Sequence, residues 1–469
     1  MSEQTAATDS RPRLAKDKLG VISVAFFVFA AAAPIGALVG ATPLIFAGAG
    51  PGAPLVILLG AILIAIFAVG YLLMARRIRN AGGFVVLVSH GLGREAAGAS
   101  AGIIVATHTG LSVGLWSLFG LFAEGMFAEW SIPIPALIWA VVGTAVSALL
   151  VIRGVSVSMS VLGVLLGFEI LCIAVLVVGV LVTTPLDAFA SPGVAIDGAI
   201  GPGIGIAFLF TFSMFTMFEA PTVFSEEARS PERTIPRALY LVVSVIAVLY
   251  AVSTWAISAA VGNDRIAQVA AENPEGFIYG LAATVIGEWF ASLLHILVVV
   301  SFFAMMIAVQ NVFSRYLFSL GRAGLISSRF SHVNRREAPL SAAILVAVII
   351  AVLLAVFMLS GVDPFTLYSW MLGVGTAGFI VVLTIASVAV IVYFRRNGSN
   401  NVLGTVVCPV IAGLGTLGVL YLVLSNYEYV GGTGIAAWLL LLSIPILAAV
   451  GAWLASRRPR VDFSDVVEG

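Results

Sequence analysis

The feature that most constrains the fold of this chain is a series of apolar blocks separated by short polar breaks. Most blocks reach the roughly 20 apolar residues that a helix needs to cross a bilayer, whereas barrel strands would alternate over about 10 residues. Hydrophobic residues make up 61% of the 469 residues and charged residues only 10%, which is too little charge for a soluble chain of this length. The blocks therefore predict an all-α integral membrane protein in a lipid bilayer.

Each block gives one expected span, and together they predict twelve transmembrane helices. The spans are Leu19–Phe46, Pro54–Ala75, Gly98–Phe122, Pro135–Ile152, Ser156–Val182, Gly203–Phe224, Pro236–Val261, Ile286–Ser314, Leu340–Leu359, Leu367–Tyr393, Val402–Leu424 and Ile435–Ala455. The first span exceeds the length of a signal-peptide core, so we expect no cleaved leader. The segment from Gly262 to Val285 is polar enough to carry a short surface helix.

The distribution of basic residues predicts the orientation. If both termini are cytoplasmic, the cytoplasmic segments hold every one of the 23 Lys and Arg residues except Arg265. This is the bias expected of loops that stay inside, and it supports the number of spans, because a missed span would scramble it downstream. We therefore expect a multi-pass protein of the cytoplasmic (inner) membrane with both termini in the cytoplasm.

Several classes of function are not expected. The net charge is zero, so no basic face predicts binding to nucleic acid. Cys172 and Cys408 both lie inside apolar blocks, which is typical of buried free thiols. We find no phosphate-binding glycine loop, no metal-ligand cluster and no nucleophile–base pair, so we expect neither an enzyme nor an ATP-driven pump, and no cofactor or metal.

Two spans carry a central proline, which removes a backbone donor and clashes with the preceding turn. The first reads Ala31-Ala32-Ala33-Pro34-Ile35-Gly36, and the sixth reads Phe218-Glu219-Ala220-Pro221. A simple proline kink explains either one alone. The matched pair, at equivalent places in two five-span halves, instead indicates broken helices whose exposed backbone groups hold a substrate.

A few polar side chains lie within spans. Glu169 and Glu219 are the acidic residues deep inside them, and each is either a proton-carrying group or a neutral carboxyl that ties two helices together. His108 and Ser112 form a polar stripe on the third span, which predicts a cavity wall, although a satisfied interior histidine explains His108 as well. For His295 we favour the satisfied interior histidine.

At these residues the chain resembles the amino acid–polyamine–organocation (APC) transporter superfamily, and within it the bacterial amino acid permeases. The match extends over most of the chain. The motifs that carry it are Phe218-Glu219, Glu226-Glu227, Pro231 and Arg233-Thr234-Ile235-Pro236-Arg237-Ala238, then Asn80-Ala81-Gly82-Gly83-Phe84 with Gly91-Leu92-Gly93-Arg94, Asn311 to Arg322, and Phe394-Arg395-Arg396.

The resemblance implies a leucine-transporter-like fold. Ten core helices would form two inverted five-helix repeats with broken helices 1 and 6, followed by two peripheral helices. The implied division is an N-terminal tail over 1–18, a transport core over 19–394 with repeats 19–182 and 203–394, two peripheral helices over 395–456 and a C-terminal tail over 457–469. Because no cysteine falls in an external segment, no obligatory protein partner is expected.

The resemblance also implies a substrate site at the two breaks, and this chain departs from the family there. Where many members have a Gly-Ser/Thr-Gly triplet, it reads Ala33-Pro34-Ile35-Gly36-Ala37, and Met217 replaces a glycine. Glu169 falls where some members have a lysine tied to coupling. The expected substrate-binding residues are Ala33, Pro34, Ile35, Gly36, His108, Ser112, Phe215, Met217 and Glu219, and the expected proton-coupling residues are Glu169 and Glu219.

These observations predict a secondary transporter for an amino acid or related amine, with proton-coupled uptake by alternating access. Sodium coupling is less favoured, because no adjacent hydroxyl pair lies near Ser301. The alternatives are an exchanger of an amino acid for its amine product, and a membrane receptor that binds an amino acid without moving it. A channel is a further option, weakened by the lack of a filter motif.

Overall fold

The computed structural model describes residues 20–78, 83–154, 159–190, 201–216, 218–219, 230–334, 338–431, 435–458 and 461–463, and within these residues all regular structure is helical. Nine of the described helices are long and apolar enough to cross a membrane, and Ala136–Ile152 and Ile204–Met214 are shorter apolar helices. The first of the nine, Pro34–Ile78, contains a turn at Gly50–Gly52 and covers parts of two expected spans. Every expected span therefore overlaps a described helix.

The bundle is built from the following helices, in chain order. They are α1 (Val21–Ala31), α2 (Pro34–Ala49), α3 (Ala53–Ile78), α4 (Phe84–Leu92), α5 (Arg94–Glu129), α6 (Ala136–Ile152), α7 (Met159–Thr183), α9 (Ile204–Met214), α10 (Pro231–Val261), α11 (Ile266–Glu272), α12 (Phe277–Val285), α13 (Glu288–Arg322), α14 (Leu340–Leu359), α15 (Pro364–Asn397), α16 (Cys408–Ser425), α17 (Glu428–Gly431), α18 (Ile435–Leu441) and α19 (Ser443–Arg457). Most ends differ from the expected spans by a few residues, but α5 and α13 extend well beyond the apolar blocks from which they were predicted.

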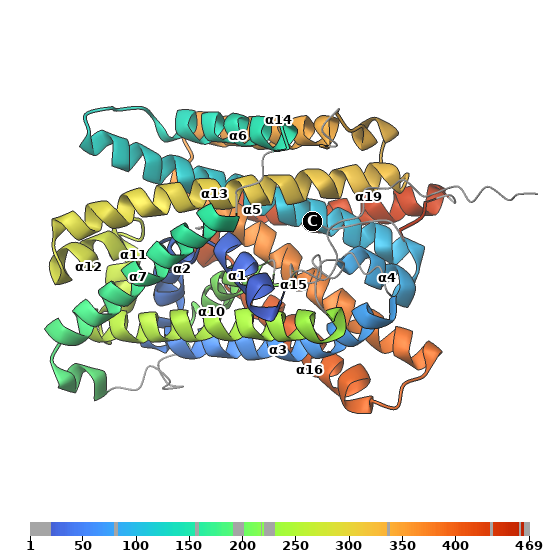
Figure 1. Cartoon of the computed structure of the whole chain (residues 1–469), viewed down its shortest axis with the longest axis horizontal. Helices are drawn as coiled ribbons and strands as arrows, with labels where there is room; N and C mark the ends of the chain where they lie inside the picture. The colour runs from blue at the N-terminus through green and yellow to red at the C-terminus, as the bar shows by residue number, and fades with distance from the viewer. Residues whose placement is uncertain are drawn as a thin grey trace, which may run out of the picture.

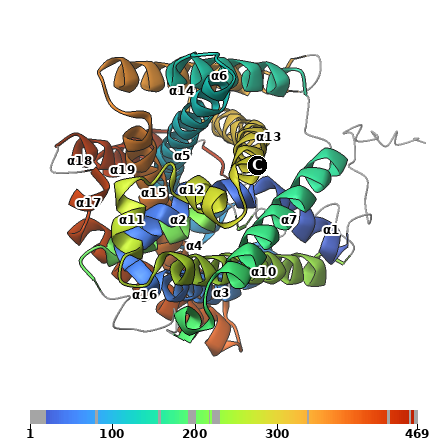
Figure 2. The same cartoon turned by 90° about the vertical axis from the view of Figure 1, so that its left-hand side faces the viewer.

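The long helices lie roughly along one direction (Figure 1). Helices α6 and α14 pack together along one edge, and α3 and α10 pack together on the other side of the bundle. The short helix α2 lies in the interior, and α1 packs against α10 and α7 at the periphery. Helix α4 lies at one end of the bundle, and α11 and α12 at the other, where the view along the bundle shows them in front (Figure 2). The segment between α10 and α13 thus holds two short helices rather than the one expected.

The outer faces of the bundle are apolar. Val178 of α7, Val352 of α14 and Leu414 of α16 have exposed fractions of 56%, 52% and 66%, and many other large aliphatic side chains are exposed in the same way. A water-soluble protein rarely exposes apolar patches of this extent. These faces are therefore the surface that meets the lipid.

Helix α5 packs against its neighbours through glycines. A Cβ atom added at Gly110 would lie 2.6 Å from the backbone nitrogen of Gly375 in α15, and one added at Gly98 would lie 2.6 Å from Cβ of Ala455 in α19. Small residues allow membrane helices to approach this closely, and the contact then gains dispersion energy along its length. As a result, α5, which carries His108, packs closely against α15 and α19.

The first expected span is broken into α1 and α2. The chain leaves helical geometry at Ala32 and Ala33, and Ala33 adopts the left-handed conformation with φ 46° and ψ 68°. Pro34 follows at the first position of α2, where its missing N–H costs no helical hydrogen bond. The sixth expected span also stops early: α9 ends at Met214 and the chain continues in turns, while Ala220 and Pro221 lie outside the described residues.

Candidate functional site

The first candidate region is the break between α1 and α2, which a carboxylate from another helix holds. Glu169 of α7 is only 2% exposed. Its Oε2 accepts a hydrogen bond from the backbone N–H of Ile35 at 3.1 Å, and its Oε1 accepts one from the hydroxyl of Ser301 in α13 at 2.5 Å. Glu169 thus links the start of α2 to two long helices.

The chemistry of a helix start explains why a carboxylate lies there. The first N–H groups of a helix have no partner within it, and the helix dipole favours negative charge at that end. Pro34 has no N–H and Ala33 makes no side-chain cap, so the amide of Ile35 is the first donor that α2 presents. Glu169 supplies the missing cap from α7.

The carbonyl side of the same break is held by a tyrosine. Tyr250 of α10 is buried, and its hydroxyl donates a hydrogen bond to the carbonyl oxygen of Pro34 at 3.2 Å. We refer to Pro34, Ile35, Glu169, Tyr250 and Ser301 as the break cluster. It joins α2, α7, α10 and α13, so a movement of α2 relative to any of the other helices must stretch one of these bonds.

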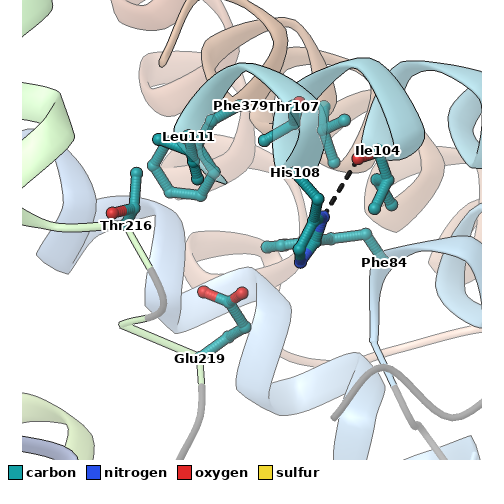
Figure 3. A pocket seen from close by; sticks show the side chains of 9 residues that line it. Phe84, Ile104, Thr107, His108, Leu111, Thr216, Glu219 and Phe379 are labelled. Carbon is teal, nitrogen blue, oxygen red and sulfur yellow. Dashed lines mark hydrogen bonds between the residues drawn. The ribbon is translucent and has the colours of Figure 1, made fainter. Parts of the chain in front are cut away.

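The second candidate region is a pocket between α4, α5, α15 and the turns that follow α9 (Figure 3). It has about 30 Å³ of space for water-sized groups, and about 380 Å³ when all the space between its lining atoms and the open solvent is counted. Its lining residues are Phe84, Ile104, Thr107, His108, Leu111, Thr216, Glu219, Phe379 and Val382. We refer to this as the Glu219 pocket, because Glu219 is the acidic residue among the described residues that line it.

The orientation of His108 in the Glu219 pocket is fixed by its neighbours. Its Nδ1 lies 3.0 Å from the carbonyl oxygen of Ile104, and its ring stacks on Phe313 and Tyr316 with centroids 5.4 Å and 5.8 Å away. A carbonyl only accepts hydrogen bonds, so Nδ1 carries the proton and, in the neutral ring, Nε2 is an acceptor. Figure 3 shows the ring and the Glu219 carboxylate facing the same space.

An aromatic wall closes one side of the Glu219 pocket. Phe84 and Phe379 line it, and behind them the ring of Phe218 lies 5.9 Å from Phe67 and 6.1 Å from Phe379. Tyr71 lies 5.6 Å from Phe84 and completes the cluster. Through these ring contacts Phe218 packs the turn after α9 against α3 and α15.

The structure separates residues that the sequence predicted for a single site. Of these, His108 and Glu219 line the Glu219 pocket, while Ala33, Pro34, Ile35 and Gly36 lie at the helix break and outside the lining. Ser112 and Phe215 are buried but are not lining residues, and Met217 lies outside the described residues. Among the described residues, the hydroxyl of Ser112 has no hydrogen-bond partner.

Sequence reasoning did not find several members of these two regions. Tyr250 and Ser301 lie in apolar spans, and nothing in their local pattern predicts that they face the first break. Thr216, Phe84 and Phe379 were likewise not predicted as lining residues. Burial of an isolated hydroxyl in a span is a signal that a bonded partner lies on another helix, but it does not say which one.

Two further groups of titratable residues lie outside both regions. His295 pairs with Glu129, whose Oε1 lies 3.3 Å from Nδ1, and its ring lies tilted against that of Tyr279, with centroids 4.7 Å apart, at the end of the bundle that carries α12. No group of three metal-ligating side chains occurs in the part of the chain that the structure describes. Cys172 and Cys408 are both free.

Comparison with known proteins gives one positive finding. A family model described as amino acid permease matches residues 19–451, a range that contains both the break cluster and the Glu219 pocket. A search of curated protein sequences gave no significant match. The matched range also spans every described helix from α1 to α18 and most of α19.

Proposed function

The chain belongs to the amino acid permease family, and from this premise we propose that it takes up its substrate by alternating access, coupled to protons. Membership makes it a multi-pass membrane transporter of amino acids and not an enzyme. The coupling ion, the direction of transport, the orientation and the repeat architecture are the parts that we propose. Each is argued from the described residues below.

We propose a twelve-span bundle with two inverted five-helix repeats. The support is the interruption of the first span at Ala32–Ala33 together with the end of α9 at Met214, inside the sixth span. Interruptions at equivalent positions of two repeats mark the substrate site in transporters of this design. The two halves then rock around the interrupted helices, and the break cluster and the Glu219 pocket lie where that motion acts.

We propose that the end of the bundle carrying α4 faces the cytoplasm. Arg396 of α15 donates to the carbonyl of Gly91 in α4, and Arg77 of α3 donates to that of Gly398, so basic residues gather at this end. Arg458 after α19 donates in the same way to the carbonyl of Gly324 after α13. Cytoplasmic loops carry such an excess of Lys and Arg. This supports a protein of a bacterial inner membrane with both termini on the cytoplasmic side.

The observation that carries proton coupling is the bond between Glu169 and Ile35. A carboxylate accepts from both Ile35 and Ser301, whereas a protonated carboxyl carries a donor of its own and holds the amide more weakly. Protonation therefore loosens α2 from α7, and deprotonation fastens it again. A proton that enters from outside is in this way linked to the position of the broken helix.

Transport by the purified full chain in liposomes tests the proposal. An inside-alkaline pH gradient should drive accumulation of amino acid, a protonophore should abolish it, and a sodium gradient alone should not replace it. Accumulation that needs only preloaded internal substrate would instead identify an exchanger. Binding without movement under any gradient would identify a receptor.

Variants make this experiment specific to the carboxyl. Glu169→Gln should uncouple transport from the pH gradient. The matched control is Glu272→Gln, which changes an exposed carboxyl on α11 that also accepts a hydrogen bond, from Gln268 at 2.7 Å. Coupling that survives Glu169→Gln unchanged would remove Glu169 from the mechanism.

A further inference from the structure

We propose that the Glu219 pocket binds a primary ammonium group at the end of a substrate side chain, so that the transported amino acid is a cationic one. This inference rests on the proposed transport function and names the substrate class of its site. It is carried by the kind of polar atoms that face the pocket and by the distance that a zwitterion keeps between its two charges.

The polar groups that face the pocket accept hydrogen bonds. The Glu219 carboxylate points into the space, and a carboxylate is an acceptor only. His108 donates its Nδ1 proton to the carbonyl oxygen of Ile104, so in the neutral ring the other nitrogen, Nε2, is an acceptor as well. An ammonium group, with three donors and no acceptor, complements such a lining.

The hydroxyls in the lining do not change this excess of hydrogen-bond acceptors over donors. Thr216 donates its hydroxyl proton to the carbonyl of Ser213 at 2.8 Å and so has none for a ligand. The hydroxyl of Thr107, which has no partner among the described residues, can turn either way, because a hydroxyl both donates and accepts. Among the residues that the structure describes, no lysine or arginine lines the pocket to receive an anionic group.

The remaining lining is apolar. Ile104 and Leu111 of α5 and Val382 of α15 give an aliphatic wall, and Phe84 and Phe379 give the aromatic one. The methylene stem of a long cationic side chain packs on such surfaces while its charged end reaches a polar group. Charge-assisted hydrogen bonds between that end and Glu219 are about twice as strong as neutral ones.

A zwitterionic headgroup fits this pocket poorly. Its ammonium and carboxylate groups share one carbon, so an α-ammonium bound to Glu219 would bring the α-carboxylate into an acceptor lining, where it meets like charge. In a lysine-like side chain, methylenes separate the terminal ammonium from the headgroup. Only the donor end then enters the Glu219 pocket, and the headgroup remains outside it.

Lysine and norleucine give the sharpest test, because norleucine has the same side chain without the ammonium group. Thermal melting of the purified full chain should show stabilisation by lysine at concentrations at least about tenfold below those that norleucine needs, the ratio expected from one charge-assisted hydrogen bond. Equal stabilisation by the two, or a stronger effect of norleucine, would overturn the inference.

Two variants locate the effect. Glu219→Gln should erase the preference for lysine over norleucine, and Glu272→Gln, on the exposed face of α11, should keep it. His108→Phe preserves the stack on Phe313 and Tyr316 but removes the Nε2 acceptor, so it should weaken lysine alone. A lysine preference that persists in both pocket variants contradicts binding in this pocket.

The liposome assay separates this inference from the proposed function. Accumulation of norleucine or leucine without lysine overturns the inference and leaves the transport function intact. Stabilisation by lysine with no movement of any amino acid supports the inference and overturns the transport function. Driven accumulation of lysine that norleucine does not inhibit supports both.

Discussion

Glu169 and Glu219 both lie deep in apolar spans, yet the structure gives them different surroundings. Glu169 extends from the middle of a continuous helix, is 2% exposed, and accepts hydrogen bonds from the backbone of α2 and the hydroxyl of Ser301. Glu219 follows the end of α9, in a turn, and its carboxylate faces a pocket. One carboxylate therefore ties helices together, and the other faces the space that a ligand can enter.

Backbone context therefore decides the surroundings of a membrane carboxylate. An interrupted helix leaves unpaired amides, and the carboxylate that reaches them becomes a cap. Glu219 instead follows the end of a helix, in a turn, and its carboxylate projects from that turn toward the pocket. The same residue type in two similar apolar stretches thus ties helices together in one region and faces a pocket in the other.

The largest effect should come from removing the Glu169 carboxylate, which ties α2 and α13 to α7. Glu169→Ala leaves the Ile35 amide and the Ser301 hydroxyl without their acceptor, and hydrogen bonds to charged groups contribute roughly 1.5–3 kcal/mol each. We therefore expect the free energy of unfolding to fall by about 3 kcal/mol, as measured by thermal melting of the detergent-solubilised protein. Ser301→Ala removes only one of the two bonds and should cost clearly less. Equal melting of the wild type and Glu169→Ala would contradict the cap.

The next effect should appear in transport rather than stability. Glu219→Gln keeps the shape of the side chain and removes its charge, so uptake should fall by roughly 10- to 150-fold, which corresponds to one charge-assisted bond of 1.5–3 kcal/mol. The melting temperature should fall less than in Glu169→Ala. If Glu219→Gln instead unfolds the protein while transport survives Glu169→Gln, the roles of the two regions are reversed.

The sequence was sufficient to predict the class of fold. Helical spans, their order and the interruption at Ala32–Ala33 all follow from local rules: block length, basic residues and the effect of Pro34. The family followed from motifs that are contiguous in the chain. These features are local, and for that reason a single sequence contains them.

The composition of the candidate regions was not predicted as well, because it depends on contacts between distant spans. Ser301 lies 132 residues from Glu169, and Tyr250 lies 216 residues from Pro34. Which face of each span turns inward depends on packing such as that of Gly110 against Gly375, which no local pattern contains. The sequence therefore predicted two residues that line the pocket, His108 and Glu219. It also assigned the residues of the first break, Ala33 to Gly36, to the same site.

A smaller effect should follow from the carbonyl side of the break. Tyr250→Phe removes the hydroxyl that donates to the Pro34 carbonyl and keeps the ring, so a neutral hydrogen bond of about 1 kcal/mol should be lost. Thermal melting of the single variant and of the double variant with Glu169→Ala checks whether the two sides act together. Strict additivity of the two losses would show that they hold the break independently.

The smallest effect should come from a carboxyl between α11 and α12, which serves as the reference for both membrane carboxylates. Burial, and then the charges of Asp363 and Glu124, raise the pKa of Glu275 above its ordinary value. Its contribution to stability is therefore present below the ordinary pKa and is lost as the pH rises through the raised one. Glu275→Gln should melt slightly above the wild type at neutral pH, by no more than about 1–2 °C, and the difference should vanish on acidification. Glu272→Gln controls for the lost charge, and a Glu275→Gln advantage that persists at acid pH would contradict this origin.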